Sequence, residues 1–372
     1  MNTLSMLKIN SNNMRLIIIV FIVLCTYMAW CDLNIEWLDV YGMVYPVFEL
    51  FTKVSPPPLV SYNSPEVITN PFAHAPFTDV TQNTIALSQN PPGCKNIKVL
   101  KTELFGKCGF GCHMHVTGSH LAYAMDNGYV LMWGENACRD YSASCKSLFL
   151  PLSTCSIKDA VSVNYIRHGG PFRFIIPKSL LQFQDKLNMT YNRFLYWWRG
   201  QSITYVMRIK PSVLSELNLK PLNEGTVHIH MRFGDKTSEA SLIHVNSYIR
   251  AYYMLLENYK VSRQHIFVSS DTSTSIEIFK ERVSANNPSV KIQHYPVQYT
   301  GFNLHMLQYN TNNNITVDFL REIYTALQAS AWIGTRFSNV DRIIDELRCT
   351  LVAKCHLPYV NLGAVRGDDY DW

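Results

Sequence analysis

Residues 331–347 read AWIGTRFSNVDRIIDEL, and this stretch decides the fold class. An apolar run gives way to a polar turn, after which apolar residues recur at helical spacing. The pattern predicts a strand over residues 331–335 and a helix over residues 338–351. The helix residues predicted to face the core are Val340, Ile343, Ile344 and Leu347. A strand that leads through a turn into a helix is the repeating unit of parallel α/β sheets.

The same alternation runs through the part of the chain that precedes this stretch. Strands separated by helices indicate a parallel, doubly wound sheet, in which ligands bind at the carboxyl ends of the strands. We therefore expect a Rossmann-type subdomain over residues 223–355. The further strands are predicted over residues 226–230, 265–269 and 290–294, and the helices over residues 246–258, 273–283 and 318–329.

An N-terminal α/β subdomain is predicted over residues 91–222. Its first elements are a strand over residues 98–104, a glycine-rich turn over residues 107–112 (KCGFGC), a helix over residues 114–129 and a strand over residues 129–133. The order strand, turn, helix, strand matches the alternation of the C-terminal half, so both halves are predicted to be α/β.

An apolar run near the N-terminus predicts a membrane anchor. Residues 16–31 are almost wholly apolar, with Lys8 and Arg15 before them and Asp32 after them. Positive charge before the run and negative charge after it favour an N-terminus in the cytosol. A cleaved signal peptide is the alternative, but bulky residues stand where a small-residue cleavage site would lie. We expect an uncleaved type II anchor.

The remaining boundaries and the composition complete this prediction. A cytosolic tail over residues 1–15, a proline-rich polar stem over residues 32–90 and a C-terminal tail over residues 356–372 flank the anchor and the two subdomains. The chain is 47% hydrophobic and 16% charged, which is a globular rather than a disordered balance. Its formal charge of +5 includes no long run of Lys and Arg, so we predict no nucleic-acid partner.

Ten cysteines are present, and eight of them follow the predicted anchor. An even number in a lumenal body predicts a disulfide framework. Cys108 and Cys112 would close a tight loop, and Cys349 and Cys355 are near enough to pair at the end of a helix. A zinc site is the alternative, because Cys-x3-Cys spacing can ligate metal, but no second close pair flanks it at finger spacing.

The first candidate site follows a predicted strand directly. It contains His230, Arg232, Asp235 and Lys236, with Glu239 three residues on. Arginine carries a permanently charged planar fork that fits phosphate oxygens, so it can offset charge on a departing diphosphate without a metal. Glu239 has the chemistry of a general base for an acceptor hydroxyl, and Lys236 would fix its position. A solvated loop is the alternative.

Three further features could bind an anion or a nucleotide. Ser338 is a good helix N-cap, with Asp341 three residues later where the acid of a capping box belongs. A helix start at the end of a parallel strand presents free N–H groups and a positive dipole to phosphate. Gly109 and Gly111 allow backbone to approach a ligand, and the Asp318 carboxylate suits the N1 and N2 edge of guanine. Plain caps and a structural turn are the alternatives.

In this order the motifs resemble the α-1,6-fucosyltransferase family. The pattern V-H-x-H-x-R-x-x-D-K together with T-x-x-S-x-V-x-R-x-x-x-E-L is quite specific. The family resemblance implies a GT-B-like fold, with a Rossmann-type parallel sheet in its C-terminal half. The matching segments are residues 88–91 with Cys94, residues 106–112, residues 196–198 with Gln201 and Tyr205, residues 227–239, residues 270–271 and residues 333–347.

The resemblance implies catalytic roles for three residues. Arg232 would bind the β-phosphate of GDP-fucose, and Glu239, assisted by Lys236, would deprotonate the acceptor hydroxyl. The family inverts the anomeric centre and needs no metal, so the donor is the only small molecule expected. By this resemblance the chain would transfer L-fucose from GDP-β-L-fucose to GlcNAc of an N-glycan core in an α-1,6 linkage.

The resemblance also implies a donor site. His230 and Asp318 would hold guanine, and Ser338 and Asn339 would cradle phosphate at the helix start. The residues implied to bind the donor are His230, Arg232, Asp235, Asp271, Asp318, Ser338, Asn339, Gly109 and Gly111.

The compartment and the disulfides follow from the same resemblance. The chain is expected in the Golgi membrane, with its catalytic part in the lumen, and the sequons at Asn188 and Asn314 agree with that. The family implies the disulfides Cys94–Cys155 and Cys108–Cys112, and spacing adds Cys138–Cys145 and Cys349–Cys355. The oligomeric state is not indicated.

Three departures from the family pattern raise alternatives. The family's second adjacent arginine is Phe233 here, and its acidic pair after the middle strand is reduced to Asp271 and Thr272. Vertebrate-type members also have a long coiled-coil stem and a C-terminal SH3-like domain, and we expect neither here. The alternatives are a fucosyltransferase with another acceptor, such as a chitin-like oligosaccharide or a protein hydroxyl, or an inactive GDP- or glycan-binding relative.

Overall fold

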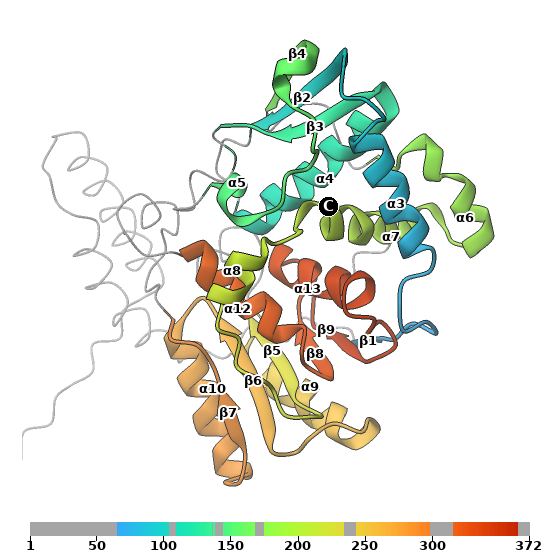
Figure 1. Ribbon diagram of the computed structural model, residues 1–372. Coiled ribbons are helices and arrows are strands. Elements are labelled where there is room, and N and C mark those ends of the chain that lie inside the picture. Colours follow the sequence, from blue (N-terminus) through green and yellow to red (C-terminus); the bar gives the residue numbers. More distant parts are fainter. Residues whose placement is uncertain are drawn as a thin grey trace, which may run out of the picture. The chain divides into compact units, whose positions relative to one another are not determined.

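Two parallel β-sheets with flanking helices form the described part of the protein (Figure 1). The computed structural model describes residues 65–103, 109–135, 137, 144–167, 175–233, 243–297 and 315–363. All of these residues belong to one unit over residues 63–372. The predicted α/β class with parallel sheets is confirmed.

The larger sheet has the strand order β1-β9-β8-β5-β6-β7. Neighbouring strands are parallel except β1 and β9, which pair antiparallel at one edge. The chain enters the parallel part at β5, moves outward through β6 and β7, and returns to β8 on the other side of β5. This reversal between β5 and β8 is the topological switch point of a Rossmann-type sheet. The strands are β1 (Glu66–Ile68), β5 (Val227–Met231), β6 (His265–Ser270), β7 (Lys291–Gln293), β8 (Ala331–Gly334) and β9 (Tyr359–Asn361).

Helices cover both faces of the larger sheet. Val227, Ile229 and Met231 of β5 point into one core, which the helices α9 and α10 complete. The alternate residues His228 and His230 point to the opposite face, where they are buried. The helices of this half are α9 (Val245–Asn258), α10 (Ser273–Asn286), α12 (Ile315–Ala326) and α13 (Asn339–Thr350).

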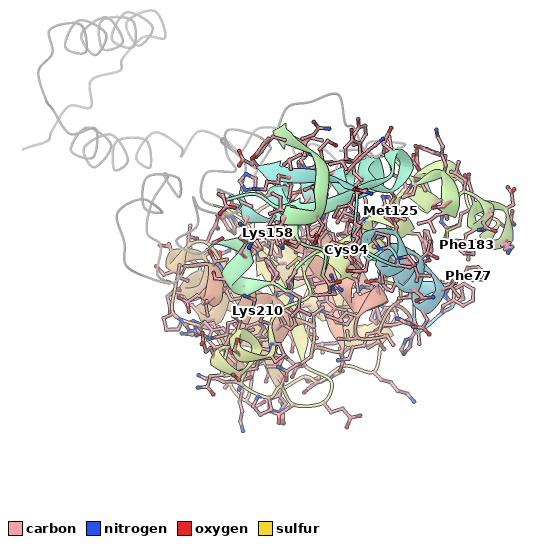
Figure 2. All side chains as sticks on the ribbon, turned by 45° about the horizontal axis from the view of Figure 1, so that its top comes forward. Phe77, Cys94, Met125, Lys158, Phe183 and Lys210 are labelled. Atoms are coloured by element: carbon pink, nitrogen blue, oxygen red, sulfur yellow. A yellow bond between two sulfur atoms is a disulfide. The ribbon has the colours of Figure 1, made fainter. Side chains whose placement is uncertain are left out.

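The smaller sheet has the order β3-β2-β4, and both of its strand pairs are parallel. Its strands are β2 (Ile97–Glu103), β3 (Tyr129–Trp133) and β4 (Ala160–Arg167), with α4 (Phe110–Asn127) between β2 and β3. The other helices here are α3 (Thr78–Gln89), α5 (Cys145–Leu148), α6 (Gln182–Leu187), α7 (Tyr191–Val206) and α8 (Pro211–Glu216). Short 3-10 turns span Ile157–Asp159 and Lys178–Leu180. At the periphery Phe77 stacks on Phe183 of α6 with ring centroids 4.8 Å apart (Figure 2).

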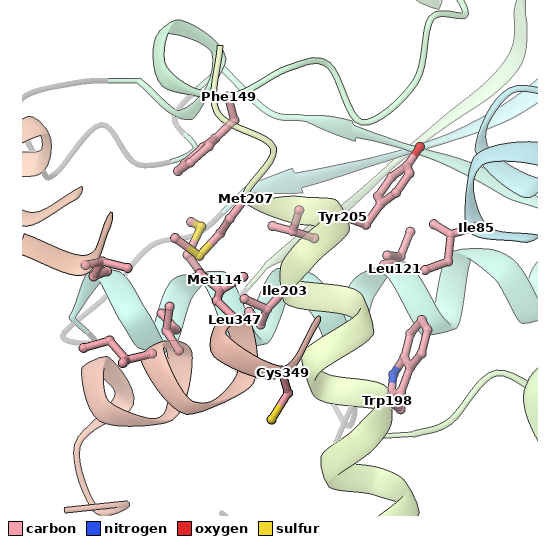
Figure 3. Close-up of a cluster of buried hydrophobic side chains, with 14 of the residues drawn as sticks. Ile85, Met114, Leu121, Phe149, Trp198, Ile203, Tyr205, Met207, Leu347 and Cys349 are labelled. Atoms are coloured by element: carbon pink, nitrogen blue, oxygen red, sulfur yellow. The ribbon is translucent and has the colours of Figure 1, made fainter. Parts of the chain in front are cut away.

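The helices α4, α7 and α13 join the two halves through one apolar core (Figure 3). Met114 of α4, Ile203 of α7 and Leu347 of α13 are each at most 1% exposed and belong to the same cluster. Small residues bring the backbones close. An ideal Cβ on Gly200 of α7 would lie 3.1 Å from a side-chain carbon of Thr350 of α13. The geometry of α13, whose start borders the switch point, is therefore tied to α4 and α7.

The folded unit extends beyond the expected boundaries of the two subdomains. The segment assigned to the stem, residues 32–90, contributes β1 and α3, and the segment assigned to the C-terminal tail, residues 356–372, contributes β9. The physical reason is pairing: β9 extends the parallel sheet beside β8, and β1 covers the edge of β9. Because β1 and β9 are three residues each, periodicity could not reveal them.

The glycine-rich segment and the cysteines were predicted with mixed success. The turn expected over residues 107–112 differs from the structure, because α4 already begins at Phe110 and Gly111 lies in its first turn. The disulfides Cys94–Cys155 and Cys349–Cys355 are confirmed. Cys112 and Cys145 are also disulfide-bonded. Their predicted partners, Cys108 and Cys138, lie outside the described residues.

Among the residues that the structure describes, none of the helices combines the length and the apolar character that a bilayer span requires. The predicted anchor, residues 16–31, and the predicted cytosolic tail lie outside the described residues.

Candidate functional site

The switch point of the larger sheet gathers the polar residues that the sequence singled out. Arg232 follows the last residue of β5, and Thr335 follows the last residue of β8. These are the two strands between which the winding direction reverses, so their carboxyl ends diverge and leave room for a ligand. Ser338 and Asn339 complete the turn that leads from β8 into α13.

Arg232 is held by a carboxylate from the neighbouring strand. Its guanidinium forms an ion pair with Asp271, which follows β6, and the side chains of Arg232 and Asp271 are 19% and 12% exposed. The other oxygen of the Asp271 carboxylate accepts a hydrogen bond from the backbone N–H of Phe233 at 2.8 Å. Asp271 thereby fastens the end of β5 to the end of β6. Asp271 was expected to bind the donor, but its carboxylate would repel a diphosphate. Its contacts instead make it a residue that orients Arg232.

The start of α13 has the predicted cap but lacks the predicted capping box. Ser338 Oγ accepts a hydrogen bond from the backbone N–H of Val340 at 3.3 Å. The Ser338 N–H instead donates to the carbonyl oxygen of Thr335 at 2.9 Å. Asp341 turns inward, where its carboxylate lies 2.8 Å from His230 Nδ1. The contact with His230 of β5 is made in place of the local capping box, so the sequence pattern for the box was misleading here.

His230 is buried beneath the turn rather than projecting from it. It is 5% exposed, and its bond to Asp341 links β5 to α13 across the switch point. Burial raises the pKa of the Asp341 carboxyl, while His230 opposes that rise. Gly334 lies against this pair, since a Cβ there would meet Asp341 Oδ1 at 2.0 Å. The close approach of Asp341 therefore requires glycine at the end of β8.

Three helix starts converge on this edge of the sheet. Phe110, the first residue of α4, contacts Phe319 of α12 edge to face, with ring centroids 5.3 Å apart. A Cβ on Gly111 would lie 2.9 Å from the Cβ of Asn339, the first residue of α13. The N–H groups and positive dipole ends of α4 and α13 therefore lie side by side, with the first turns of α12 next to them. Gly109 is the N-cap of α4.

Two acidic residues of α12, Asp318 and Glu322, lie near Phe319 at this edge of the sheet. Asp318 forms an ion pair with Arg321, and each side chain is 25% exposed. Glu322 is one turn further along the same face. Burial raises the pKa of the Glu322 carboxyl to about 7, with His230 lowering it and Asp318 raising it. Glu322 thus lies within electrostatic reach of His230.

A buried group of charges supports the start of α13 from below. Arg336 pairs with Asp345 at 2.6 Å, and Arg199 of α7 pairs with Glu346 at 2.7 Å. Burial lowers the pKa of Arg342 to about 9, and Arg199 adds to that effect. Arg342 donates to Asn339 Oδ1 at 3.3 Å. Arg342 therefore places a positive charge at the start of α13, which favours an anion there.

The site residues predicted from sequence divide into two groups. The structure brings together Arg232, Asp271, His230, Ser338, Asn339, Gly109 and Gly111 around the edge of the larger sheet, with Asp318 on the adjoining helix. Asp235, Lys236 and Glu239 lie outside the described residues. No group of three His, Cys, Asp or Glu side chains suited to a metal ion occurs within the described ranges.

Sequence reasoning missed two acidic residues and one arginine. Glu322 had a signal, since it lies one turn from Asp318 on the same helix face. Glu346 had only its place in the family pattern and Arg199 had no signal, because their pairing depends on how α7 packs on α13.

Part of the chain matches a known protein family. The family model described as alpha-(1,6)-fucosyltransferase N- and catalytic domains matches residues 72–175. Alpha-(1,6)-fucosyltransferases of Drosophila melanogaster and Caenorhabditis elegans are each 26% identical to the chain, over 229 and 236 residues. Over these segments the chain is similar to α-1,6-fucosyltransferases. The two alignments each cover 54% of this chain but only 36% and 42% of those relatives, so the chain matches less than half of their length.

Solved structures of fucosyltransferases resemble the chain with a lower sequence identity. An Arabidopsis thaliana FUT1 variant in complex with GDP has 11% identity and a TM-score of 0.45, covering 78% of this chain and 80% of that chain. NodZ α-1,6-fucosyltransferase soaked with GDP-fucose has 12% identity and a TM-score of 0.40, covering 71% of this chain and 99% of that chain.

Proposed function

We propose that the chain is a GDP-fucose-dependent fucosyltransferase that transfers L-fucose with inversion to a glycan, with GlcNAc of an N-glycan core as the acceptor and an α-1,6 linkage as the product. The sequence similarity to α-1,6-fucosyltransferases supports the reaction class. The observation that carries the proposal for this chain is the position of Arg232. It follows β5 at the switch point and is held there by Asp271.

The donor would bind with its diphosphate at these helix starts. The positive dipole ends of α4 and α13 at these helix starts suit phosphate oxygens. Arg232 adds a permanent charge beside the β-phosphate, the group that gains negative charge as the bond to fucose breaks. His230 and Asp318 are proposed for guanine, although His230 would act mainly by holding Asp341, since its Nδ1 is already engaged.

The transfer step would be a single displacement. The acceptor hydroxyl oxygen forms a bond to C1 of fucose while the bond from C1 to the β-phosphate oxygen breaks on the opposite face, which inverts the centre and releases GDP. The hydroxyl proton passes to Glu239, positioned by Lys236, and Asp235 completes the donor site; all three assignments follow the family motif. Charge neutralisation by arginine and helix dipoles supports a reaction without a metal.

We further propose that the protein works in the Golgi lumen behind an uncleaved type II anchor. Two disulfides in the described chain support an oxidising compartment. The apolar run over residues 16–31 and the charges around it support the anchor.

An inactive GDP-binding relative is the second candidate. Phe233 occupies the position of the family's second arginine, and it packs partly buried against the core formed by α9 and α10. It therefore supplies no charge to a diphosphate, which leaves the site with a single arginine from this motif.

Transfer of fucose decides between these candidates. The secreted protein over residues 32–372 is incubated with GDP-fucose, EDTA and a panel of N-glycans and chitin oligosaccharides, and added fucose is detected by mass spectrometry. We expect one added fucose on an N-glycan, lost in both Glu239→Gln and Arg232→Ala. Transfer only to chitin oligosaccharides would change the acceptor, and GDP binding without turnover would favour the inactive relative.

A further inference from the structure

A buried carboxylate joins the three helices that meet behind the candidate site. Glu346 of α13 accepts a hydrogen bond from His115 Nε2 of α4 at 2.8 Å and from Arg199 Nη2 of α7 at 2.7 Å. All three side chains are at most 5% exposed. We call these three residues the Glu346 clamp. Because the two contacts use different carboxylate oxygens, the position and the rotation of α13 are both fixed.

The clamp lies on the helix faces that lead to the site. His115 is four residues after Gly111 on α4, and Glu346 is seven residues after Asn339 on α13, so each pair shares one face of its helix. At the far end of those faces Gly111 contacts Asn339, with 2.9 Å between an ideal Cβ and the Asn339 Cβ. The two helices therefore run side by side in the same direction with their starts together, and the clamp joins them one to two turns further along.

The charge of the clamp is nearly balanced. Burial lowers the pKa of His115, while Glu346 opposes that effect, so the imidazole is neutral and donates its Nε2 hydrogen to the carboxylate. Arg199 remains the cationic partner of Glu346. Three further arginines, Arg336, Arg342 and Arg348, lie along α13 and the turn before it, and two of them, Arg336 and Arg348, bind Asp345.

We propose that His115, Glu346 and Arg199 are positioning residues for the donor, which hold the starts of α4 and α13 at the spacing that one diphosphate requires. The inference rests on the proposed function for the identity of the ligand, but the spacing itself belongs to the structure. None of the three needs to touch the donor. Their contribution is that the two sets of N–H groups are already in place before the donor binds.

Positioning and charge alone have opposite expected effects on the affinity of Glu346→Gln for GDP. Replacing Glu346 by Gln removes a negative charge close to a site for an anion, which alone would strengthen the binding of a diphosphate. The same change removes the negative charge that pairs with Arg199 and one of the two acceptor oxygens, which would loosen the spacing of the helix starts and weaken binding. If positioning dominates, Glu346→Gln binds GDP more weakly despite its more positive field.

Three variants separate positioning from general loss of stability. Glu346→Gln keeps the shape of the side chain, and His115→Leu is a milder variant that leaves the charged pair with Arg199 intact. Val283→Ala is the matched control, because Val283 is fully buried at the far end of α10 and lies in the other core cluster. The affinity for GDP is measured by titration calorimetry, and exchange of the amide hydrogens of α4, α10 and α13 by mass spectrometry.

We expect faster exchange at the starts of α4 and α13 in both clamp variants, with α10 unchanged. Their dissociation constants for GDP should rise about tenfold, while Val283→Ala exchanges faster only in α10 and binds GDP as the wild type does. The donor KM should rise with kcat changed less than about twofold, since the reacting groups are intact.

Unchanged exchange at both helix starts would overturn the proposal, as would GDP binding equal to that of the control or tighter than wild type. If the folded wild type binds no GDP, the proposed function fails, and the exchange of the two helix starts still decides whether the clamp sets their spacing. If Glu346→Gln does not fold, His115→Leu carries the same two readouts.

Discussion

At the scale of single residues, Gly111 makes the close contact between the starts of α4 and α13. A Cβ there would lie 2.9 Å from the Cβ and 3.1 Å from the backbone carbonyl carbon of Asn339. We predict that Gly111→Ala lowers the free energy of unfolding by about 2 kcal/mol, because the backbone of α13 cannot yield as a side chain can. Gly109→Ala is the control, since nothing lies within 4 Å of its Cβ, and its loss should stay under about 1 kcal/mol. Equal losses in urea unfolding would contradict the contact.

The carboxyl group of Glu322 gives a prediction about pH. Burial raises its pKa from 4.5 to about 7, so the folded state favours the protonated form. The stability that this group contributes is present below its unfolded pKa and is lost as the pH rises through about 7. We predict that wild type loses about 1–2 kcal/mol relative to Glu322→Gln between about pH 5 and pH 8, half of the full linkage because the side chain is partly exposed. If the stabilities of the two proteins changed in parallel with pH, burial would not raise the pKa of Glu322.

At the scale of elements, Ser338 combines the roles of helix cap and phosphate seat. Its Oγ accepts from the N–H of Val340 at 3.3 Å, and Thr190 caps α7 through the N–H of Arg193 at 3.4 Å. We predict that Ser338→Ala and Thr190→Ala each cost about 1 kcal/mol of stability. Only Ser338→Ala should also weaken GDP binding, by about fivefold, because α13 alone of these two helices starts at the switch point. An equal effect of both variants on GDP would leave Ser338 as a cap and nothing more.

The elements that the sequence predicted well are those whose pattern is local. The strands of the C-terminal half and the helix at residues 339–350 were predicted to within a few residues, because apolar spacing reports burial directly. The edge strands at residues 66–68 and 359–361 are too short for any period to show. The helix start at Phe110 was read as a turn, because glycines in a first helical turn look like a loop when the packing against Asn339 is unknown.

At the scale of the whole molecule, the site depends on contacts between distant parts of the chain. The order of the parallel strands follows from their alternation with helices, so the edge that carries Arg232 was predictable. The partners were not. Asp341 serves His230 rather than a capping box, and Glu346 joins α4 and α7, which precede it by more than a hundred residues. Such pairings depend on tertiary packing, which local patterns do not contain.

The most direct test of the central claim is a calorimetric titration of the secreted protein with GDP and with ADP, repeated for Arg232→Ala. The account predicts that GDP binds at least about tenfold more tightly than ADP. It also predicts that Arg232→Ala weakens GDP binding by about 10- to 100-fold, the worth of a charge-assisted hydrogen bond to phosphate. A folded protein that binds neither nucleotide, or an Arg232→Ala variant with wild-type affinity for GDP, would contradict a donor site at this edge of the sheet.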